Sequence, residues 1–317
     1  MSYLGVMAMH TAKSCTAKTT SCAASCISGG ANIRQNHDRY RIKNTLIGGG
    51  LMRDSAIRLD GQKILITGVS RPLGIGATLA KRFAEAGAVV AIHGYSAYDL
   101  TVGERNSADP NGTEIIAKQY QDMGLHVTLV APSDFEIHGN AEKAVEEAVE
   151  KLGGLDGLIL NHCYGTHVEI GGWTSKDIDT HLMVNVRASM MMMQSFVNQI
   201  DTAKNNVITL FTSGQYLSPM KNEMAYCVSK EAIICLCRQS AWELGDRNIR
   251  VNCINPGAND TGYCSGEVYA EVAKLHPSGH WGTPDDAADL ALFLHSSYAK
   301  WITGQVIASD GGIKESW

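Results

Sequence analysis

The sequence predicts an α/β protein built on a single doubly wound parallel sheet with helices on both faces. From about residue 60 onward, short apolar runs rich in β-branched residues alternate with segments of helical periodicity. Most strand candidates contain no charged residue, which is typical of strands buried on both faces. Apolar residues make up 44% of the 317 residues and charged residues 19%, so the chain can bury a core of this kind.

The elements of the first half are predicted in order from these patterns. KILIT at 63–67 is the first strand, and a helix at about 76–86 and a second strand at 89–93 follow it. Residues 95–112 are polar and rich in turn-forming residues, so we expect a loop there. The remaining elements are a helix at 114–123, a strand at 126–131, the amphipathic helix AEKAVEEAVEKL at 141–152 and a strand at 157–161.

The second half continues the same alternation of helices and strands. No solenoid period is present, and a single domain accounts for the alternation better than two domains do. Its predicted elements are a helix at 178–200, a strand at 206–212, a helix at 224–245, a strand at 249–254, a helix at 285–296 and a strand at 305–309.

The N-terminal segment differs in composition from the rest of the chain. Residues 1–58 carry a charge balance of +6 and the remainder one of −11, which together give the net charge of −5. The segment is rich in Ser, Thr, Ala and Cys and shows no sustained periodicity. We therefore predict a disordered or transit-like extension at 1–56 and a folded domain at 57–317, with a true start at Met52 as a further interpretation.

Charge, hydropathy and cysteine usage argue against several classes of partner. A net charge of −5 favours no nucleic-acid partner, and no apolar run approaches the roughly 18 residues that cross a membrane. Cys15, Cys22 and Cys26 have neither the paired spacing of zinc ligands nor a matching His pair, so no metal site is expected. The other six cysteines lie in apolar segments, as buried free thiols of a reducing compartment do. We expect a cytoplasmic protein, or an organellar one if residues 1–56 are a transit peptide.

A glycine-rich turn, TGVSRPLGIG, joins the first predicted strand to the first helix. Glycines let the backbone approach a pyrophosphate, and the helix start supplies free N–H groups and the positive end of the helix dipole. At the head of a βα series, this turn predicts a dinucleotide-binding, Rossmann-type domain at 57–317. The residues expected to bind the cofactor here are Gly68, Ser70, Arg71, Gly74, Ile75 and Gly76.

Two positions bear on the choice between NAD and NADP. An NAD site usually places an acid at the end of the second strand to bond the ribose hydroxyls. Here that strand ends in Ile92-His93-Gly94-Tyr95, which contains no acid, and Arg71 in the glycine turn is suited to a 2′-phosphate. We therefore expect NADP(H) in preference to NAD(H), and NAD(H) is the alternative cofactor.

Tyr226 and Lys230 are four residues apart on a predicted helix, so both project from one face. A nearby ammonium favours a phenolate and lowers the pKa of a phenol toward the range useful in acid–base catalysis. Ser213 follows the preceding strand, where its hydroxyl can bond the same substrate oxygen. Taken alone, a Tyr-x3-Lys pair is equally well explained by an exposed helix face.

Together, the glycine turn and these three residues resemble the short-chain dehydrogenase/reductase superfamily over about residues 60–313. The nearest likeness is to its 3-oxoacyl-carrier-protein-reductase-like members. Further matching segments are Asp134 after the third strand, Asn161 after the fourth, Asn185 in VNVR, Pro256-Gly257 with Thr261 after the sixth strand, and ITGQ at 302–305 leading to DGG at 310–312.

The resemblance implies a role for each matching residue. Tyr226 would give a proton to a carbonyl oxygen as hydride arrives from the nicotinamide, and Ser213 would orient that carbonyl. Lys230 would lower the pKa of the tyrosine and bind the nicotinamide ribose, while Asn185 would hold a water that connects Lys230 to solvent. The other implied cofactor contacts are Asp134 at the adenine, Asn161 in the cleft, and Pro256, Gly257 and Thr261 near the carboxamide.

The sequence also departs from the usual pattern. Five residues instead of three separate Gly68 from the next glycine, which resembles the enoyl-reductase branch. Enoyl reductases place their tyrosine seven residues before the lysine, where this chain has Glu223, so the tyrosine spacing is that of ketoreductases and alcohol dehydrogenases. The usual Asn-Asn-Ala-Gly segment reads NHCY at 161–164, and we expect His162 to be packed or solvent-facing rather than in contact with substrate.

The combined reading is an NADP(H)-dependent oxidoreductase that reduces a small-molecule carbonyl to an alcohol, or the reverse. One alternative is an NAD-dependent hydroxysteroid or sugar-alcohol dehydrogenase. Another is a non-catalytic, dinucleotide-sensing protein on the same fold, against which the complete set of Ser213, Tyr226, Lys230 and Asn185 argues. The resemblance implies a homo-oligomer, either a tetramer or a dimer. Segment 262–282, which selects the substrate in this family, encodes no substrate that can be recognised from its sequence.

Overall fold

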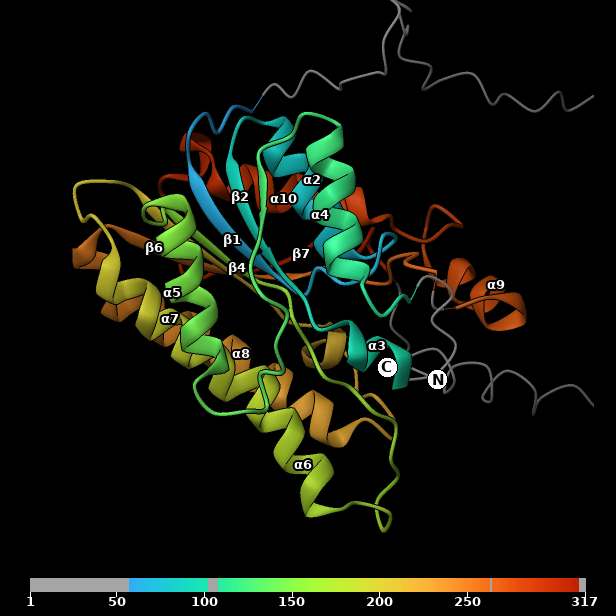
Figure 1. Cartoon of the computed structure of the whole chain (residues 1–317). Coiled ribbons are helices and arrows are strands. Elements are labelled where there is room, and N and C mark those ends of the chain that lie inside the picture. Colours follow the sequence, from blue (N-terminus) through green and yellow to red (C-terminus); the bar gives the residue numbers. More distant parts are fainter. Residues whose placement is uncertain (1–56, 102–107, 263, 314–317) are drawn as a thin grey trace, which may run out of the picture.

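The computed structural model describes residues 57–101, 108–262 and 264–313. These residues form one sheet of seven parallel strands in the order β3-β2-β1-β4-β5-β6-β7, with helices on both faces (Figure 1). The predicted doubly wound α/β class is therefore confirmed. The strands are β1 (Lys63–Thr67), β2 (Val89–His93), β3 (Val127–Leu129), β4 (Gly157–Leu160), β5 (Asn206–Phe211), β6 (Ile249–Asn255) and β7 (Val306–Ala308).

The helices fill the connections between the strands. The α-helices are α2 (Ile75–Glu85), α3 (Ser96–Thr101), α4 (Gly112–Asp122), α5 (Asn140–Leu152), α6 (Ser175–His181), α7 (Ala188–Gln199), α8 (Met224–Glu243), α9 (Gly266–Leu275) and α10 (Pro284–His295). Between α6 and α7 the chain forms a π-helix, η2 (Leu182–Arg187). Short 3-10 turns are η3 (Gly214–Tyr216), η4 (Gly245–Arg247) and η5 (Ser297–Ala299).

Successive residues of β1 face opposite cores, as the period-two geometry of a strand requires. Ile64 and Ile66 belong to one apolar cluster, which joins the sheet to α2, α4 and α10. Leu65 belongs to a second cluster, which joins the opposite face of the sheet to α5, α7 and α8. Burial on both faces explains why the strand patterns contain few charges.

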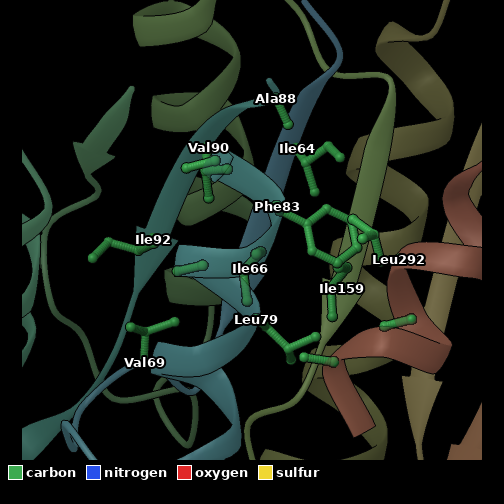
Figure 2. Close-up of a cluster of buried hydrophobic side chains, with 14 of the residues drawn as sticks. Ile64, Ile66, Val69, Leu79, Phe83, Ala88, Val90, Ile92, Ile159 and Leu292 are labelled. Carbon is green, nitrogen blue, oxygen red and sulfur yellow. The ribbon is translucent and has the colours of Figure 1, made fainter. Parts of the chain in front are cut away.

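The first cluster fixes α2 on the sheet. Figure 2 shows Phe83 of α2 among side chains of the central strands and Leu292 of α10. Phe83 is fully buried, and burial of such a side chain stabilises the fold by about 1.5–3 kcal/mol. Because α2 begins directly after the glycine turn, this packing also fixes the position of that turn.

Two segments differ from the sequence prediction. The segment predicted as a loop at 95–112 contains α3, whose Tyr98 hydroxyl donates to the Gly165 carbonyl at 3.1 Å, so tertiary contact supports this short helix. The single helix predicted at 178–200 is divided into α6, η2 and α7, and a π-helix of this kind is frequent at functional sites. In addition, α9 lies within 262–282, where no element was predicted.

The prediction for residues 1–56 lies outside the described residues. Among the residues that the structure describes, no helix combines the length and apolarity needed to span a membrane. Within the same ranges, no group of His, Cys, Asp and Glu side chains is arranged to hold a metal ion.

His295, at the end of α10, gives the fold a defined response to acid. Its ring packs edge-on against Phe83, with centroids 5.1 Å apart, and its Nε2 lies 3.1 Å from the Thr209 hydroxyl. Burial, with a smaller effect of the Arg250 charge, lowers the pKa of His295 from 6.5 to about 3. The folded protein therefore excludes a proton that the unfolded chain binds.

We predict that the free energy of unfolding falls as the pH drops from about 6.5 toward 3, with His295 contributing about 1.4 kcal/mol per pH unit. Above pH 6.5 this contribution is fully present, because neither state is protonated. Urea unfolding at several pH values should show a shallower pH slope for His295→Gln. A wild-type pH slope in His295→Gln would contradict the assignment.

Candidate active site

A cavity of about 980 Å³ lies at the carboxyl ends of the central strands. The strand order reverses between β1 and β4, and such a reversal opens a crevice in which doubly wound folds bind their ligands. The cavity is lined by residues that follow β1, β2, β4, β5 and β6, so segments distant in sequence meet there.

The glycine turn forms one wall of this cavity by close backbone contact. A Cβ atom at position 76 would collide with the Gly68 carbonyl oxygen, and one at position 68 would lie 2.8 Å from the Asn161 Nδ2. Asn161 in turn donates from Nδ2 to the Thr67 and Gly68 carbonyls at 3.3 and 3.2 Å. Glycine at both positions therefore lets the turn pack directly against its own backbone and the end of β4.

The start of α2 completes this cradle. The helix begins at Ile75, and the residue before it is Gly74, which has no side chain to cap the first N–H groups. Helix starts of this kind bind anions through their N–H groups and dipole. The turn and the helix start thus fit the pyrophosphate of a dinucleotide.

Arg71 crosses the cavity and has partners on two sides. Its Nε lies 3.5 Å from the Asp99 carboxylate, and its Nη1 donates to the Thr261 carbonyl at 3.0 Å. The Ser70 hydroxyl donates to the same carboxylate. Asp99 is only 4% exposed and lines the cavity. Sequence reasoning missed Asp99 because it lies in the segment taken for a loop.

The end of β2 leaves no room for an acid at position 94. A Cβ there would collide with the Val69 carbonyl and the Thr113 hydroxyl. The preceding His93 is buried, its Nε2 lies 3.0 Å from the Ser133 hydroxyl, and burial lowers its pKa to about 3. Asp134 lines the cavity nearby and accepts from the Glu136 backbone N–H at 2.8 Å.

Tyr226 and Ser213 line the same cavity as the glycine turn, from the first turn of α8 and from the residues after β5. Lys230 is one helical turn further along α8 and is 4% exposed. Its Nζ lies 5.8 Å from the centroid of the Tyr226 ring and donates to the Phe211 carbonyl at 2.9 Å. Ser213 and Tyr226 therefore share one cavity, and the Lys230 ammonium lies beside the tyrosine ring.

Asn185 lies behind the cavity wall, in the π-helix η2. Its side chain accepts from the Tyr164 N–H at 2.7 Å and donates to the Tyr164 carbonyl at 2.9 Å. It also donates to the Ser229 hydroxyl at 2.8 Å, and Ser229 donates to the Tyr226 carbonyl. These contacts fasten the segment after β4 to the first turn of α8, and a water link to Lys230 stays a prediction.

Three of the remaining predicted residues follow β6, and His162 follows β4. Pro256, Gly257 and Thr261, after β6, line the cavity. His162 is held between the Thr67 hydroxyl, 2.7 Å from its Nδ1, and the Val184 carbonyl, 3.2 Å from its Nε2. Burial, followed by the charges of His93 and Lys230, lowers the pKa of His162 to about 3, so it is a packed neutral imidazole.

The cavity is also lined by polar and apolar side chains from four further segments. The sequence predicted none of them individually as a ligand-binding residue, because none belongs to a short motif. They are Tyr164 and His167 after β4, Thr180 of α6, Met220 and Glu223 before α8, and Cys264 and Val268 around α9.

Three comparisons with known proteins agree with this geometry. The model of a family described as enoyl-(acyl carrier protein) reductase matches residues 68–314. The chain is 31% identical to the uncharacterized oxidoreductase YjdA of Bacillus subtilis (strain 168), over 78% of this chain and 95% of that protein. It is 29% identical to glucose 1-dehydrogenase of Gluconobacter oxydans (strain 621H), over 81% and 93%. It is 28% identical to 3-oxoacyl-[acyl-carrier-protein] reductase FabG of Chlamydia pneumoniae, over 81% and 98%.

Solved structures show the same likeness. A short-chain dehydrogenase from Burkholderia cenocepacia J2315 in complex with NADP superposes with a TM-score of 0.70 at 28% identity. The match covers 80% of this chain and 98% of that one.

Proposed function

The chain belongs to the short-chain dehydrogenase/reductase superfamily as an oxidoreductase of CH–OH and C=O groups, and on this premise we propose that it interconverts a carbonyl and an alcohol with NADP(H). The observation that carries the proposal is the shared cavity. Tyr226 and Ser213 face the same space as the glycine turn, and the Lys230 ammonium lies 5.8 Å from the tyrosine ring.

The proposed chemistry divides between the cofactor and the chain. When bound, the nicotinamide supplies a hydride to the carbonyl carbon or accepts one from the alcohol carbon. The Tyr226 hydroxyl gives the carbonyl oxygen its proton, or takes it back in the reverse direction. The Ser213 hydroxyl donates to that oxygen and orients it.

Lys230 supports this proton transfer electrostatically. A buried ammonium next to a phenol favours the phenolate, so it eases loss of the Tyr226 proton. Its bond to the Phe211 carbonyl holds the ammonium in place without neutralising it. Asn185 would keep the segment after β4 aligned with α8 and would contribute to reprotonation of the site.

Residues of the glycine turn would hold the cofactor, together with residues that follow four strands. The proposed set consists of Lys230, which lies beside the Tyr226 ring, and twelve residues that line the cavity: Gly68, Ser70, Arg71, Gly74, Ile75, Gly76, Asp134, Asn161, Tyr226, Pro256, Gly257 and Thr261. A preference for NADP(H) is supported by the steric exclusion of an acid at position 94 and by Arg71 in the cavity. The NADP complex of the Burkholderia relative supports it further.

Carbonyl chemistry fits the chain better than enoyl reduction does, despite the description of the matching family. Tyr226 lies four residues before Lys230, which is the ketoreductase spacing. Enoyl reductases have their tyrosine seven residues before the lysine, and this chain has Glu223 there, which carries no phenol. A second candidate function, a sugar-alcohol dehydrogenase, is favoured by the polar residues near Tyr226 and by the glucose 1-dehydrogenase relative.

Assembly and organisation remain part of the proposal. We infer a homo-oligomer, either a tetramer or a dimer, because α7 and α8 carry large apolar residues that are exposed to solvent. The exposed fractions are 51% for Met190 of α7, and 45% for Met224 and 53% for Val228 of α8. Residues 57–317 would form the catalytic domain and residues 1–56 an extension to it. The six described cysteines are free thiols, which supports a reducing compartment such as the cytoplasm.

We predict that Tyr226→Phe lowers kcat by about 10²- to 10⁴-fold on a panel of carbonyl and alcohol substrates, because it removes the proton donor. Its Kd for the dinucleotide should stay close to that of the wild type. Tyr298→Phe, at a 74% exposed tyrosine, is the matched control and should keep full activity. Full turnover by Tyr226→Phe would refute the assigned acid, and a wild type that binds the dinucleotide but turns over no substrate would favour the dinucleotide-sensing alternative.

We predict that Arg71→Ala lowers kcat/KM with NADPH by about 10- to 100-fold, because it removes a charged partner of the 2′-phosphate. The value with NADH should change by only about threefold or less, since NADH lacks that phosphate. Asp99→Asn should shift preference further toward NADPH, because the carboxylate next to Arg71 competes with the phosphate. A wild type that prefers NADH in the same steady-state assay would contradict the cofactor assignment.

A further inference from the structure

The segment that follows β3, residues 133–138, forms part of the cavity wall, and we call it the β3 loop. Its residues that line the cavity are Ser133, Asp134, Phe135 and Glu136. The Phe135 ring is 4% exposed and stacks on the His93 ring, with centroids 4.3 Å apart. It also meets the His162 ring edge-on at 4.8 Å. The β3 loop is therefore packed against the ends of β2 and β4.

The β3 loop lies on the opposite side of the glycine turn from the catalytic residues. In the sheet order, β3 and β2 flank β1 on one side, and β4 and β5 flank it on the other. Ser213 follows β5, and the glycine turn follows β1. A dinucleotide with its pyrophosphate at the glycine turn and its nicotinamide near Tyr226 therefore extends its adenosine half toward the ends of β2 and β3.

The backbone of the β3 loop is held by one side chain from the π-helix η2. Arg187 Nη2 donates to the Phe135 carbonyl at 2.8 Å and to the Glu136 carbonyl at 2.6 Å. Its Nη1 lies 3.2 Å from the His138 Nε2. A guanidinium carries several donors in a fixed plane, so a single side chain can bond all three groups at once.

Other bonds shape the loop locally. The Asp134 carbonyl accepts from the Asn140 Nδ2 at 3.0 Å, and the Asp134 carboxylate accepts from the Glu136 N–H at 2.8 Å. The Glu136 carboxylate pairs with Lys176 of α6, whose side chain is 73% exposed, and such surface pairs contribute little. Arg187 differs from these ties because it joins two consecutive backbone carbonyls of the cavity wall to an element about fifty residues further along the chain.

The helix η2 contacts both sides of the cavity. Asn185, two residues before Arg187, is bonded to Tyr164 and to Ser229, which in turn donates to the Tyr226 carbonyl. Arg187 reaches the β3 loop from the same six-residue helix. One short element thus supports the catalytic side through Asn185 and the opposite side through Arg187.

We propose that Arg187 is a positioning residue for cofactor binding, which holds the β3 loop in the shape that receives the adenosine half of the dinucleotide. This inference rests on the proposed function. Arg187 is not among the described residues that line the cavity, so it acts through the loop backbone and not by touching the cofactor. Its contribution is to fix the loop before the cofactor arrives, which lowers the entropy lost on binding.

A positioning role has a signature that direct contact with the cofactor lacks. The two dinucleotides differ only in the 2′-phosphate, and the bonds of Arg187 go to backbone carbonyls and to His138. Loss of these bonds should therefore weaken NADPH and NADH by the same factor. Arg71, which lies in the cavity, is expected to act on NADPH alone.

We predict that Arg187→Met raises the Kd of both NADPH and NADH by about 5- to 30-fold, because the loop carbonyls lose their charged donor. The dissociation constants can be measured from the change in cofactor fluorescence on binding. In steady-state assays the KM for the dinucleotide should rise in parallel, and kcat should stay within about threefold of the wild-type value, because the Tyr226 side of the cavity keeps its own ties.

A fragment of the cofactor and a conservative variant sharpen the test. The affinity for 2′-phosphoadenosine 5′-diphosphoribose, which contains the adenosine half without the nicotinamide, should fall by the same factor as that for NADPH. Arg187→Lys should give an intermediate Kd, because an ammonium can donate to a loop carbonyl but lacks the planar fork. This variant also keeps the test informative if Arg187→Met folds poorly.

Arg247→Met is the matched control. Arg247 also donates from Nη2 to a backbone carbonyl, that of Val197, at 2.9 Å, and it is half-buried like Arg187. It does not belong to the described lining of the cavity. Its replacement removes a bond of the same kind and should leave both dissociation constants at their wild-type values.

The outcomes separate failure of the positioning role from failure of the proposed function. The role is overturned if Arg187→Met binds both dinucleotides like the wild type, if it weakens NADPH alone, if the fragment keeps its affinity, or if Arg247→Met gives the same loss. If the wild type binds a dinucleotide but turns over no carbonyl or alcohol, the proposed reaction fails, and the dissociation constants still decide the role of Arg187. A wild type that binds neither dinucleotide overturns both.

Discussion

The contact between the glycine turn and the end of β4 determines where the rest of the site lies. Gly76 packs on the Gly68 carbonyl, and Asn161 donates to the carbonyls of Thr67 and Gly68, so two neighbouring strands end in one rigid backbone unit. Any side chain at position 76 would open this unit and displace the start of α2. Because α2 is fixed by the core around Phe83, the N–H groups at its start and the bare turn stay aligned toward the same cavity.

A second constraint is the buried ammonium of Lys230, which fixes the helix that carries Tyr226 against the end of β5. A charge that is 4% exposed is costly without partners, and here it is bonded to the carbonyl of Phe211 at the end of β5. The next two residues along the chain lead to Ser213, so one hydrogen bond ties the helix that carries Tyr226 to the segment that carries Ser213. Asn185 adds a parallel tie from the segment after β4, through Tyr164 and Ser229. The three segments are therefore held together by bonds that lie behind the cavity rather than in it.

The sequence was sufficient for the parts of the molecule that depend on local pattern. Alternating apolar runs predicted the seven strands and the doubly wound sheet. The resemblance to the superfamily, carried by short motifs, predicted that Tyr226 and Ser213 would reach the same site as the glycine turn. The α3 helix was missed because contacts such as the one between Tyr98 and Gly165 support it, and no six-residue polar pattern encodes these. Asp99, Glu223 and His167 were missed as site residues for a related reason. Each has its partner in a segment distant along the chain, and only the folded structure brings the two together.

The cofactor side and the substrate side of the cavity are built from different parts of the chain. The cofactor side is built largely from backbone geometry, from glycines and from strand ends, which a family can preserve at about 30% identity because few side chains must be kept. The substrate side is built from side chains on the segment after β4, the start of α8 and the region of α9, each of which can change without disturbing the sheet. Likeness over most of the chain therefore transfers the class of reaction and not the substrate. The chemistry of the few side chains around Tyr226 bears on the substrate more directly than the overall identity does.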